Sequence, residues 1–441
     1  MPMRLLLPLL VLLLGPLTAQ DTLEDSIRSV LEKGIAAGAF PGAQVLVWHH
    51  GQPLVHVTAG YHTYDKERAT RPDDVYDLAS VTKTSTALLV LMQQYGEHRL
   101  DLDAPLGLLF EELKGTDKQE IPLRSVLAHR AGLLPWVPYW QSTLRGNARY
   151  PWRKSWDATR TNDYRFRPRT IRRDSSRRFP IRLTDDLWLH HNYREKDIYR
   201  AIRKSPLKPP GDYVYSGLLF YLLPQYVERT TGQDYRSYLR ENFYDPLGAD
   251  ELGYRPLDRG IPLDRIVPTE VDTFFRMDTL HGVVHDEGAA LMNGVSANAG
   301  LFSTAEDLAK LYQMLMNGGT YQGRRYLTEE AVQEFTRYQY PEEGSHRGLG
   351  FDKPLLQYDA ATSSVAKDAS PASFGHSGYT GTFVWADPEY DLLYIFLSNR
   401  VHPSRNRRGI YELSIRPRIH EMIYSFIKRN DSEDEARRMR R

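Results

Sequence analysis

Residues 80–91 read SVTKTSTALLVL and set a serine and a lysine three positions apart at the start of an apolar stretch. The periodicity predicts a helix over residues 83–95, with its apolar part buried in the centre of a domain. Side chains three positions apart share one face of a helix, so the Ser80 hydroxyl and the Lys83 amine can hydrogen-bond. A serine becomes a nucleophile when a base removes its proton, and a buried lysine can be that base. The segment therefore predicts a catalytic pair at a helix N-terminus, whose positive field stabilises developing negative charge.

The Ser-x-x-Lys spacing is a weak signal by itself, because four such pairs occur in the chain. Ser205 is followed by a proline, and Ser364 lies in a polar stretch rich in alanine and serine. Ser425 falls in a predicted helix with core-like neighbours. Only Ser80 stands at a loop-to-helix junction followed by an apolar helix, which makes it the candidate nucleophile.

Two later segments carry residues that suit the same chemistry. Tyr215 follows a Pro-Gly turn at residues 210–211 and precedes an apolar run. Residues 375–382, GHSGYTGT, are rich in glycine and lead into a predicted strand. A strand edge flanked by glycines lets a substrate approach the backbone and offers N–H groups to an oxyanion. Alone, Tyr215 also fits a core tyrosine and His376 a loop histidine, so neither residue decides the function by itself.

On either side of these segments, the two ends of the chain carry the same predicted elements in reverse order. A helix and a hairpin are predicted first, and a hairpin and a helix are predicted last. The ranges are a helix over 22–37, strands over 43–48 and 53–58, strands over 382–386 and 392–398, and a helix over 410–427. Such ends can pair into one antiparallel sheet covered by helices, with the middle of the chain as an inserted lobe. Ser303 and Glu306 form a capping-box pattern that predicts one more helix from about residue 305.

Three motifs together resemble a known family. Ser80-Val-Thr-Lys83, Tyr215-Ser216 and His376-Ser-Gly378 look like the three motifs of class C β-lactamases and D-alanyl-D-alanine carboxypeptidases, a family that also includes esterases. Further stretches are similar to exported bacterial members of that family, and they are Phe40–Val47, Leu127–Leu133, Ser296–Thr304, Gly375–Gly381 and Ser398–Arg400. The resemblance spans residues from about 38 to 400, most of the chain.

The resemblance implies an α+β fold, in which an antiparallel sheet is sandwiched by helices in three layers and carries an inserted, mostly helical lobe. It makes Ser80 the acylated nucleophile, with Lys83 and Tyr215 sharing its proton. Which of the two is the general base stays open. The oxyanion hole would come from the backbone N–H groups of Ser80 and Tyr379. The residues expected at the substrate and oxyanion positions are His376, Ser377, Gly378 and Tyr379.

The sequence departs from the family pattern at two site positions. His376 stands where many members carry lysine, and we expect it to orient the substrate and to add positive charge at mildly acid pH. Gly217 stands where the family's second motif carries an asparagine. In the family that amide hydrogen-bonds the lysine and the acyl amide of the substrate. Its absence argues against efficient recognition of β-lactams or peptides more than against acyl transfer itself.

The first nineteen residues, MPMRLLLPLLVLLLGPLTA, predict a cleaved secretory signal. Arg4 precedes an apolar run from Leu5 to Leu14, and a Gly-Pro break with small residues follows. The run is too short to span a bilayer comfortably. We therefore expect export to the periplasm or the medium, without stable membrane insertion after cleavage; an uncleaved anchor is the alternative.

The mature chain is expected to be a single domain. Its predicted parts are a sheet part at about 20–79 and 290–430, a helical lobe at about 80–289, and a charged tail at 431–441. The 441 residues are 41% hydrophobic and carry a net charge of +1, which fits a folded domain and argues against a nucleic-acid-binding chain. The absence of cysteine excludes a disulfide scaffold, an iron–sulfur cluster and a thiol nucleophile.

The charge is unevenly distributed. Residues 145–204 hold 15 Arg and 3 Lys against 7 acidic residues, a net charge of +11. This Arg-rich excursion has little apolar periodicity, as expected for a lid over the site or for a solvated insertion without a role. As a lid, its charge would suit an anionic or cell-wall substrate.

These observations predict an exported serine hydrolase that acts through an acyl-enzyme on an ester or amide, with a small-molecule or peptidoglycan-derived substrate. An esterase or peptidase is favoured, followed by a D-Ala-D-Ala carboxypeptidase and a β-lactamase. A non-catalytic cell-wall-binding relative is the alternative, although an intact Ser80, Lys83 and Tyr215 argue against it. No cofactor is expected. No metal is expected either, because His281 and His285, although four positions apart, lie in a predicted loop and not on a helix.

Overall fold

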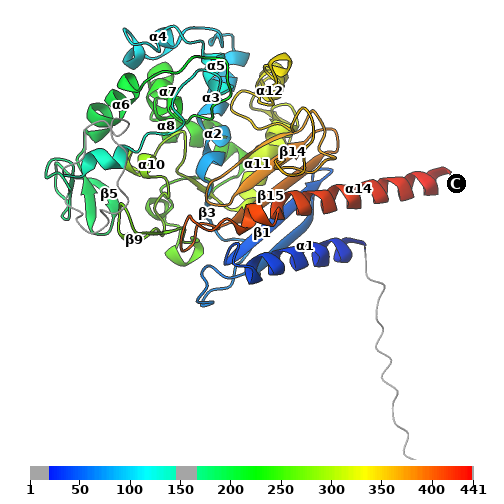
Figure 1. Ribbon diagram of the computed structural model, residues 1–441. Helices are drawn as coiled ribbons and strands as arrows, with labels where there is room; N and C mark the ends of the chain where they lie inside the picture. The colour runs from blue at the N-terminus through cyan, green and yellow to red at the C-terminus, as the bar shows by residue number, and fades with distance from the viewer. Residues whose placement is uncertain (1–18, 146–165, 440–441) are drawn as a thin grey trace, which may run out of the picture.

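A five-stranded antiparallel sheet joins the two ends of the chain (Figure 1). The computed structural model describes residues 19–145 and 166–439. The strand order is β13 (Phe374–Ser377), β14 (Phe383–Asp387), β15 (Leu392–Ser398), β1 (Gly42–His49) and β2 (Gln52–Gly60). The first and last hairpins meet where β1 pairs with β15, with Val45 opposite Phe396. The predicted union of the two hairpins in one sheet is confirmed.

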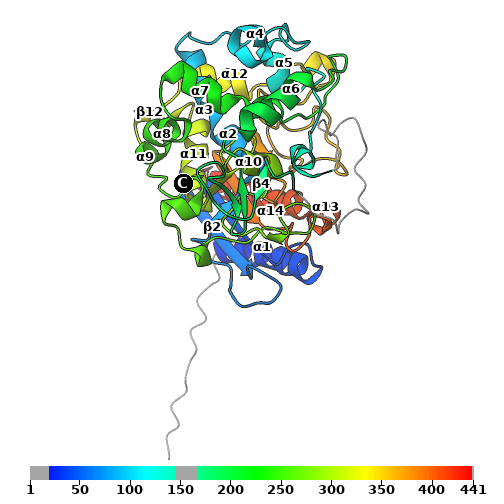
Figure 2. The same cartoon turned by 90° about the vertical axis from the view of Figure 1, so that its left-hand side faces the viewer.

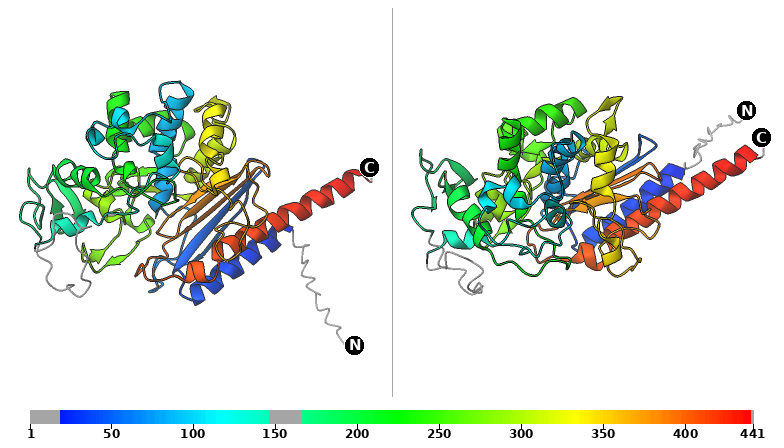
Figure 3. Two further views of the ribbon diagram at one scale, coloured as in Figure 1. Left: turned by 45° about the horizontal axis from the view of Figure 1, so that its top comes forward. Right: turned by 90° about the horizontal axis from the view of Figure 1, so that it is seen from above.

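Alternate side chains of the sheet enter two different hydrophobic cores. On β15, Tyr394 and Phe396 pack towards helices α1 (Ala19–Ala36) and α14 (Ile415–Met439), whereas Ile395 packs towards the lobe. The two helices run side by side over one face of the sheet (Figures 1 and 3). Helix α11 (Ala305–Met316) lies against the other face. This is the predicted three-layer α+β arrangement.

The middle of the chain forms the inserted lobe, whose helices lie on the side of the sheet away from α1 (Figure 2). Its helices are α2 (Thr82–Ser85), α3 (Ala87–Gly96), α4 (Leu106–Leu109), α5 (Leu123–Leu127), α6 (Arg200–Lys204), α7 (Leu223–Thr231), α8 (Tyr235–Leu239), α9 (Asp245–Leu247) and α10 (Glu287–Leu291). Short strands β3 (Tyr76–Asp77), β10 (Leu301–Ser303) and β7 (Gly253–Tyr254) form a second small sheet. The remaining short elements are β8 (Val271–Asp272), β9 (Asp278–Thr279), β11 (Thr320–Tyr321), β12 (Arg324–Arg325), α12 (Glu329–Thr336) and α13 (Gly409–Glu412).

The described part of the Arg-rich excursion also contains strands. Strands β4 (Ile171–Arg172), β6 (Leu187–Leu189) and β5 (Ile181–Thr184) pair into a small antiparallel sheet. Residues 146–165 of the excursion lie outside the described residues. In the described ranges, no helix is both long enough and apolar enough to cross a membrane.

Two predicted helices are each divided in two, whereas α11 starts where the sequence predicts and differs only in its cap. The helix expected over 83–95 is divided into α2 and α3 at Thr86, where φ is −137° and ψ is −106°. The cap of α11 is Thr304, whose side chain accepts the Asp307 N–H, and not the pair Ser303 and Glu306. The closing helix is divided into α13 and α14, with Ser414 between them at a φ of 48°. In the two divided helices, the backbone angles at Thr86 and Ser414 interrupt an apolar period that continues through them.

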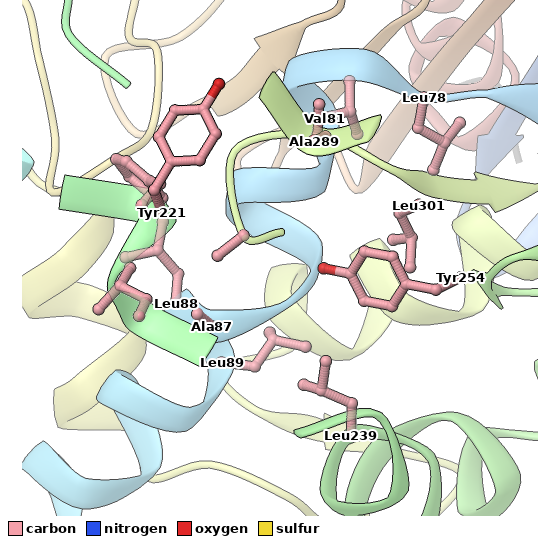
Figure 4. Packing of buried hydrophobic residues seen from close by; sticks show 14 of the residues in the cluster. Leu78, Val81, Ala87, Leu88, Leu89, Tyr221, Leu239, Tyr254, Ala289 and Leu301 are labelled. Carbon is pink, nitrogen blue, oxygen red and sulfur yellow. The ribbon is translucent and has the colours of Figure 1, made fainter. Parts of the chain in front are cut away.

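The apolar half of the Ser80 segment is the centre of the lobe, as predicted. Leu88, Leu89 and Val81 are fully buried and belong to one hydrophobic cluster with Tyr221, Tyr254 and Leu301 from distant parts of the chain (Figure 4). A rigid and dry surrounding of this kind fixes the backbone that carries Ser80.

Candidate active site

Ser80 lies in a strained turn between β3 and α2. It belongs to η1 (Ala79–Val81), a single turn of 3₁₀ helix, and Ala79 has a φ of 45°, a left-handed conformation that costs a non-glycine residue energy. The Asp77 carboxylate holds this turn, because it accepts the Ala79 N–H at 2.8 Å and the His285 N–H at 2.7 Å. Burial raises the pKa of Asp77, and the two N–H donors oppose that rise.

Ser80 and Lys83 form the predicted pair. Lys83 Nζ donates to Ser80 Oγ at 3.0 Å and to the main-chain oxygen of Asn298 at 2.9 Å. The lysine is buried among apolar side chains, with its Nζ 5.4 Å from the Phe220 ring centroid. A buried lysine therefore orients the serine hydroxyl.

Tyr215 comes from the loop before helix α7 and reaches the same point. Its hydroxyl oxygen is buried, and its ring centroid is 5.3 Å from Lys83 Nζ. His129 helps to hold the loop, since its Nδ1 accepts the Ser216 N–H at 3.2 Å. The Tyr215 hydroxyl makes no hydrogen bond within the described residues. Burial of the phenol works to raise its pKa, but the charge of Lys83, the nearby Ser80 hydroxyl and the charge of Arg347 together lower the pKa of Tyr215 below its ordinary value. Tyr215 is thus poised to accept a proton.

His376 lies on the edge strand β13, with its ring centroid 6.1 Å from that of Tyr215. Its Nδ1 contacts the Ser377 carbonyl at 2.7 Å, and its buried Nε2 has no partner among the described residues. Burial, followed by the charges of Arg347 and Lys83, lowers the pKa of His376 well below its ordinary value. The expectation that His376 gains positive charge at mildly acid pH is therefore wrong, because two cations and a dry environment keep it neutral.

The residues after His376 bring the backbone against the Ser80 turn. A Cβ at Gly378 would lie 2.5 Å from the Leu78 oxygen and 2.0 Å from Thr382 Oγ1, so only glycine fits this close approach. Ser377, Gly378 and Tyr379 line the same cleft as Ser80. This places every predicted substrate and oxyanion residue at one site.

Sequence reasoning missed the charged wall of the cleft. Arg347 is buried, pairs with Asp352, and lies 5.9 Å from the Tyr215 ring centroid. Both residues line the cleft, as do Tyr213 and Tyr411. A lone arginine in a loop before Gly-Leu-Gly carries no signal that separates it from a surface arginine.

Gly217 has an ordinary backbone and space beside it. Its φ is not in the left-handed region, and a Cβ there would meet only Asn298 Cβ, at 3.8 Å. The contact to the lysine that the family assigns to an asparagine side chain at this position is made here by the Asn298 main-chain oxygen. The Asn298 side chain contacts Ser296, Tyr221 and Asp286 and is fixed in place.

The other Ser-x-x-Lys pairs lie away from the cleft. Ser205 Oγ donates to the Ile202 oxygen at 2.8 Å, Ser364 is exposed, and Ser425 is exposed on α14. None of the residues described between 166 and 204 lines the Ser80 cleft, so a lid function of the Arg-rich excursion has no support in that part. His285 and Glu287, which could suggest a metal, contact Glu270 and Arg405 instead.

Known proteins are similar to this chain in sequence or in fold. The chain is 35% identical over 214 residues to an Escherichia coli K12 protein named "Putative D-alanyl-D-alanine carboxypeptidase", which covers 46% of this chain and 48% of that protein. The chain thus spans about half the length of the curated relatives it matches. A penicillin-binding protein homologue from Caulobacter crescentus has the same fold, with a TM-score of 0.63, 20% identity, and coverage of 92% of this chain and 97% of that one. EstCE1, described as a hydrolase with promiscuous acyltransferase activity, also aligns with a TM-score of 0.63, at 18% identity over 91% of this chain and 99% of that one.

The family model described as Beta-lactamase matches residues 27–415, which hold Ser80, Lys83, Tyr215 and His376 as well as both halves of the sheet. A match over most of the chain, on the fold and site geometry described above, shows that the chain belongs to the Beta-lactamase family.

Proposed function

We propose that this protein is an exported serine hydrolase that cleaves an ester or amide through an acyl-enzyme on Ser80. The observation that carries the proposal is the contact of Lys83 Nζ with Ser80 Oγ at 3.0 Å, beside a tyrosine whose pKa is lowered. Membership of the Beta-lactamase family supports it. Export rests on the composition of residues 1–19.

We infer the following reaction from these groups. Ser80 Oγ forms a bond to the carbonyl carbon while its proton passes to Tyr215, and the carbonyl oxygen becomes an oxyanion. The Ser80 and Tyr379 N–H groups stabilise that oxyanion. Collapse of the intermediate expels the leaving group, which takes the proton from Tyr215. A water molecule then repeats the sequence on the acyl-enzyme and releases the acid.

Tyr215 is the favoured base. Lys83 acts on it as a nearby cation and keeps the phenolate accessible at lower pH than for a free tyrosine. Lys83 thereby assists the proton transfer while it orients the Ser80 hydroxyl.

A second candidate is a D-alanyl-D-alanine carboxypeptidase, because the curated relatives carry that name over the half of the chain that aligns. One measurement distinguishes the two candidates: a carboxypeptidase releases D-alanine from an acylated D-Ala-D-Ala peptide.

The test is covalent labelling with a fluorescent fluorophosphonate and a fluorescent penicillin in parallel. In the first reaction Ser80 Oγ forms a bond to phosphorus and fluoride leaves. We expect fluorophosphonate labelling, with the added mass on the peptide that contains Ser80. Ser80→Ala should abolish it, whereas Ser205→Ala and Ser425→Ala, which alter matched Ser-x-x-Lys pairs, should leave it within a few-fold. An adduct that persists on the Ser80→Ala protein contradicts the assignment, and labelling by neither probe indicates a binding protein.

A further inference from the structure

Three half-exposed tyrosines surround the Ser80 cleft. Tyr213, Tyr379 and Tyr411 are 43%, 47% and 39% exposed, and all three line the cleft with Ser80. In the described ranges only one other tyrosine is as exposed, Tyr358, which does not line it. Large aromatic side chains are usually covered in a folded protein, so their gathering at one cleft points to a ligand.

Buried arginines hold these rings in place. The Arg400 guanidinium carbon lies 4.5 Å from the Tyr379 ring centroid and 5.1 Å from that of Tyr411. Arg400 is itself fixed, since its Nε donates to the main-chain oxygen of Tyr379 at 2.9 Å. Arg347 lies 6.0 Å from the Tyr213 ring centroid. Rings that are ordered before a ligand arrives cost less entropy on binding.

The described lining of the cleft offers no unpaired charge to a ligand. Arg347 is paired with Asp352, and burial with two neighbouring cations lowers the pKa of His376, which keeps it neutral. Lys83 does not line the cleft and is engaged by Ser80 and Asn298. A carboxylate seated on this lining would lose hydration and meet no unpaired cation in the lining itself; the nearest other cations, Arg400 and Arg408, lie behind the Tyr411 ring at 5.1 and 5.8 Å from its centroid.

We propose that the cleft selects esters or amides that carry a flat, uncharged, apolar ring beside the scissile carbonyl, and that Tyr213, Tyr379 and Tyr411 pack against this ring. The proposal rests on the proposed function, because the ring is seated while Ser80 attacks. A well-placed aromatic contact improves binding by roughly two- to ten-fold for each ring.

The test compares kcat/KM within two substrate series, each normalised to the rate of hydroxide hydrolysis. In the acyl series, 4-nitrophenyl acetate, cyclohexylacetate, phenylacetate and 4-carboxyphenylacetate share a leaving group. In the thiol series, ethyl and benzyl thioacetate share an acyl group. We expect the phenyl or benzyl member to exceed its small partner by about ten-fold in at least one series. We also expect the carboxylated ring to lose that gain.

Matched variants test whether the cleft tyrosines cause the preference for the ring. Tyr213→Ala and Tyr411→Ala should each reduce the preference for the ring by two-fold or more, and the corresponding phenylalanine variants should retain it. Tyr358→Ala, at an equally exposed tyrosine outside the cleft, should leave it unchanged. Tyr379 is not altered, because its N–H is assigned to the oxyanion hole.

Fluorophosphonate labelling of Ser80 separates the two proposals. A labelled protein that shows no ring preference in either series, or that accepts the cyclohexyl ester as well as the phenyl ester, overturns the ring proposal alone. A protein that is not labelled at Ser80 overturns the proposed function and with it the ring proposal.

Discussion

At the residue scale, the site depends on how Lys83 changes Tyr215. The lysine cation offsets the burial that would otherwise raise the pKa of the phenol. A general base acts in its deprotonated form, so the acylation rate of the wild-type protein should rise with pH and level off below pH 10, the ordinary value for tyrosine.

The variant Lys83→Met tests this arrangement. Without the cation, burial dominates and the pKa of Tyr215 rises, so we expect levelling to move above pH 10 and the acylation rate at neutral pH to fall by roughly 10²–10⁴. Single-turnover acylation by 4-nitrophenyl esters between about pH 6 and 11 measures both effects. Tyr215→Phe serves as the control, because it removes the base and with it the rise of the acylation rate with pH. If the acylation rate of Lys83→Met rises with pH over the same range as that of the wild type, a group other than Tyr215 is the base.

Gly217 carries a second prediction at this scale. An asparagine fits, because the backbone is ordinary and a Cβ there is 3.8 Å from its nearest neighbour. A buried amide that pairs with the acyl amide of a substrate contributes about 1–3 kcal/mol. We therefore expect Gly217→Asn to raise the ratio of β-lactam to ester hydrolysis, measured as kcat/KM for a cephalosporin and an aryl ester. Gly217→Ala is the matched control, and an equal rise in both variants would show that the amide is not responsible.

At the scale of elements, the turn from β3 to α2 is the feature that places the nucleophile. Asp77 offers one carboxylate oxygen to each of two N–H groups, at Ala79 and at His285. An asparagine has a single acceptor oxygen, so Asp77→Asn leaves one buried donor unpaired, at a cost of about 1–3 kcal/mol. We expect slower acylation as well as lower stability.

A second change separates the two effects. Ala79→Gly removes the steric cost of a positive φ and should restore part of the stability of Asp77→Asn, measured by urea denaturation. Acylation, followed by stopped flow, should remain slow if the carboxylate positions Ser80. Full recovery of the acylation rate with the stability would mean that Asp77 acts only on folding.

Several elements of the fold and one contact of the site could be predicted from the sequence. Apolar periodicity predicted both hairpins of the large sheet, because each strand alternates between two cores. The spacing of Ser80 and Lys83 predicted their contact, because a single helical turn fixes it. The interruption at Thr86 was not predicted, since Thr86 Oγ1 donates to the Thr82 oxygen without disturbing the apolar pattern.

Contacts between distant residues account for what the sequence left open. Arg347 reaches the site across more than a hundred residues of chain, and neither its type nor its neighbours mark it. The charge state of His376 depends on Arg347 and on burial, so the motif alone gave the wrong expectation. Asn298 lies in the family-like stretch Ser296–Thr304, but the resemblance did not indicate that its main-chain oxygen holds Lys83.

At the scale of the whole molecule, a buried ionic cluster ties the lobe to the sheet part. Arg405, which follows β15, donates from Nε to Glu270 at 2.9 Å and from Nη2 to Glu287 at 2.7 Å. His285 contacts Glu270 at 2.9 Å through its ring and Asp77 through its N–H. The cluster therefore connects both parts of the fold to the turn that carries Ser80.

This cluster predicts how stability depends on pH. Burial works to raise the pKa of Glu270, but hydrogen bonds from His285 and Arg405 lower the pKa to about 2. A folded-state pKa below the unfolded value stabilises the protein above pH 4.5, by about 3 kcal/mol, and this contribution is lost as the pH falls towards 2.

Arg405→Ala should remove most of that contribution and leave Glu270 buried without its cation. We expect the free energy of unfolding at pH 7 to fall by about 3 kcal/mol, with the difference from wild type shrinking as the pH drops below 4.5. Urea denaturation at pH 7, 4.5 and 3 measures this, with the exposed Arg408→Ala as the matched control. A difference of equal size at pH 7 and pH 3 would mean that Arg405 stabilises the fold by packing on Phe274, at 4.3 Å from its ring centroid, rather than by charge. His285 contacts both Glu270 and Asp77, so the cluster is linked to the Ser80 turn. If Arg405 acts through its charge, acylation by Arg405→Ala should weaken in parallel with its stability. If Arg405 acts by packing, acylation should not follow stability.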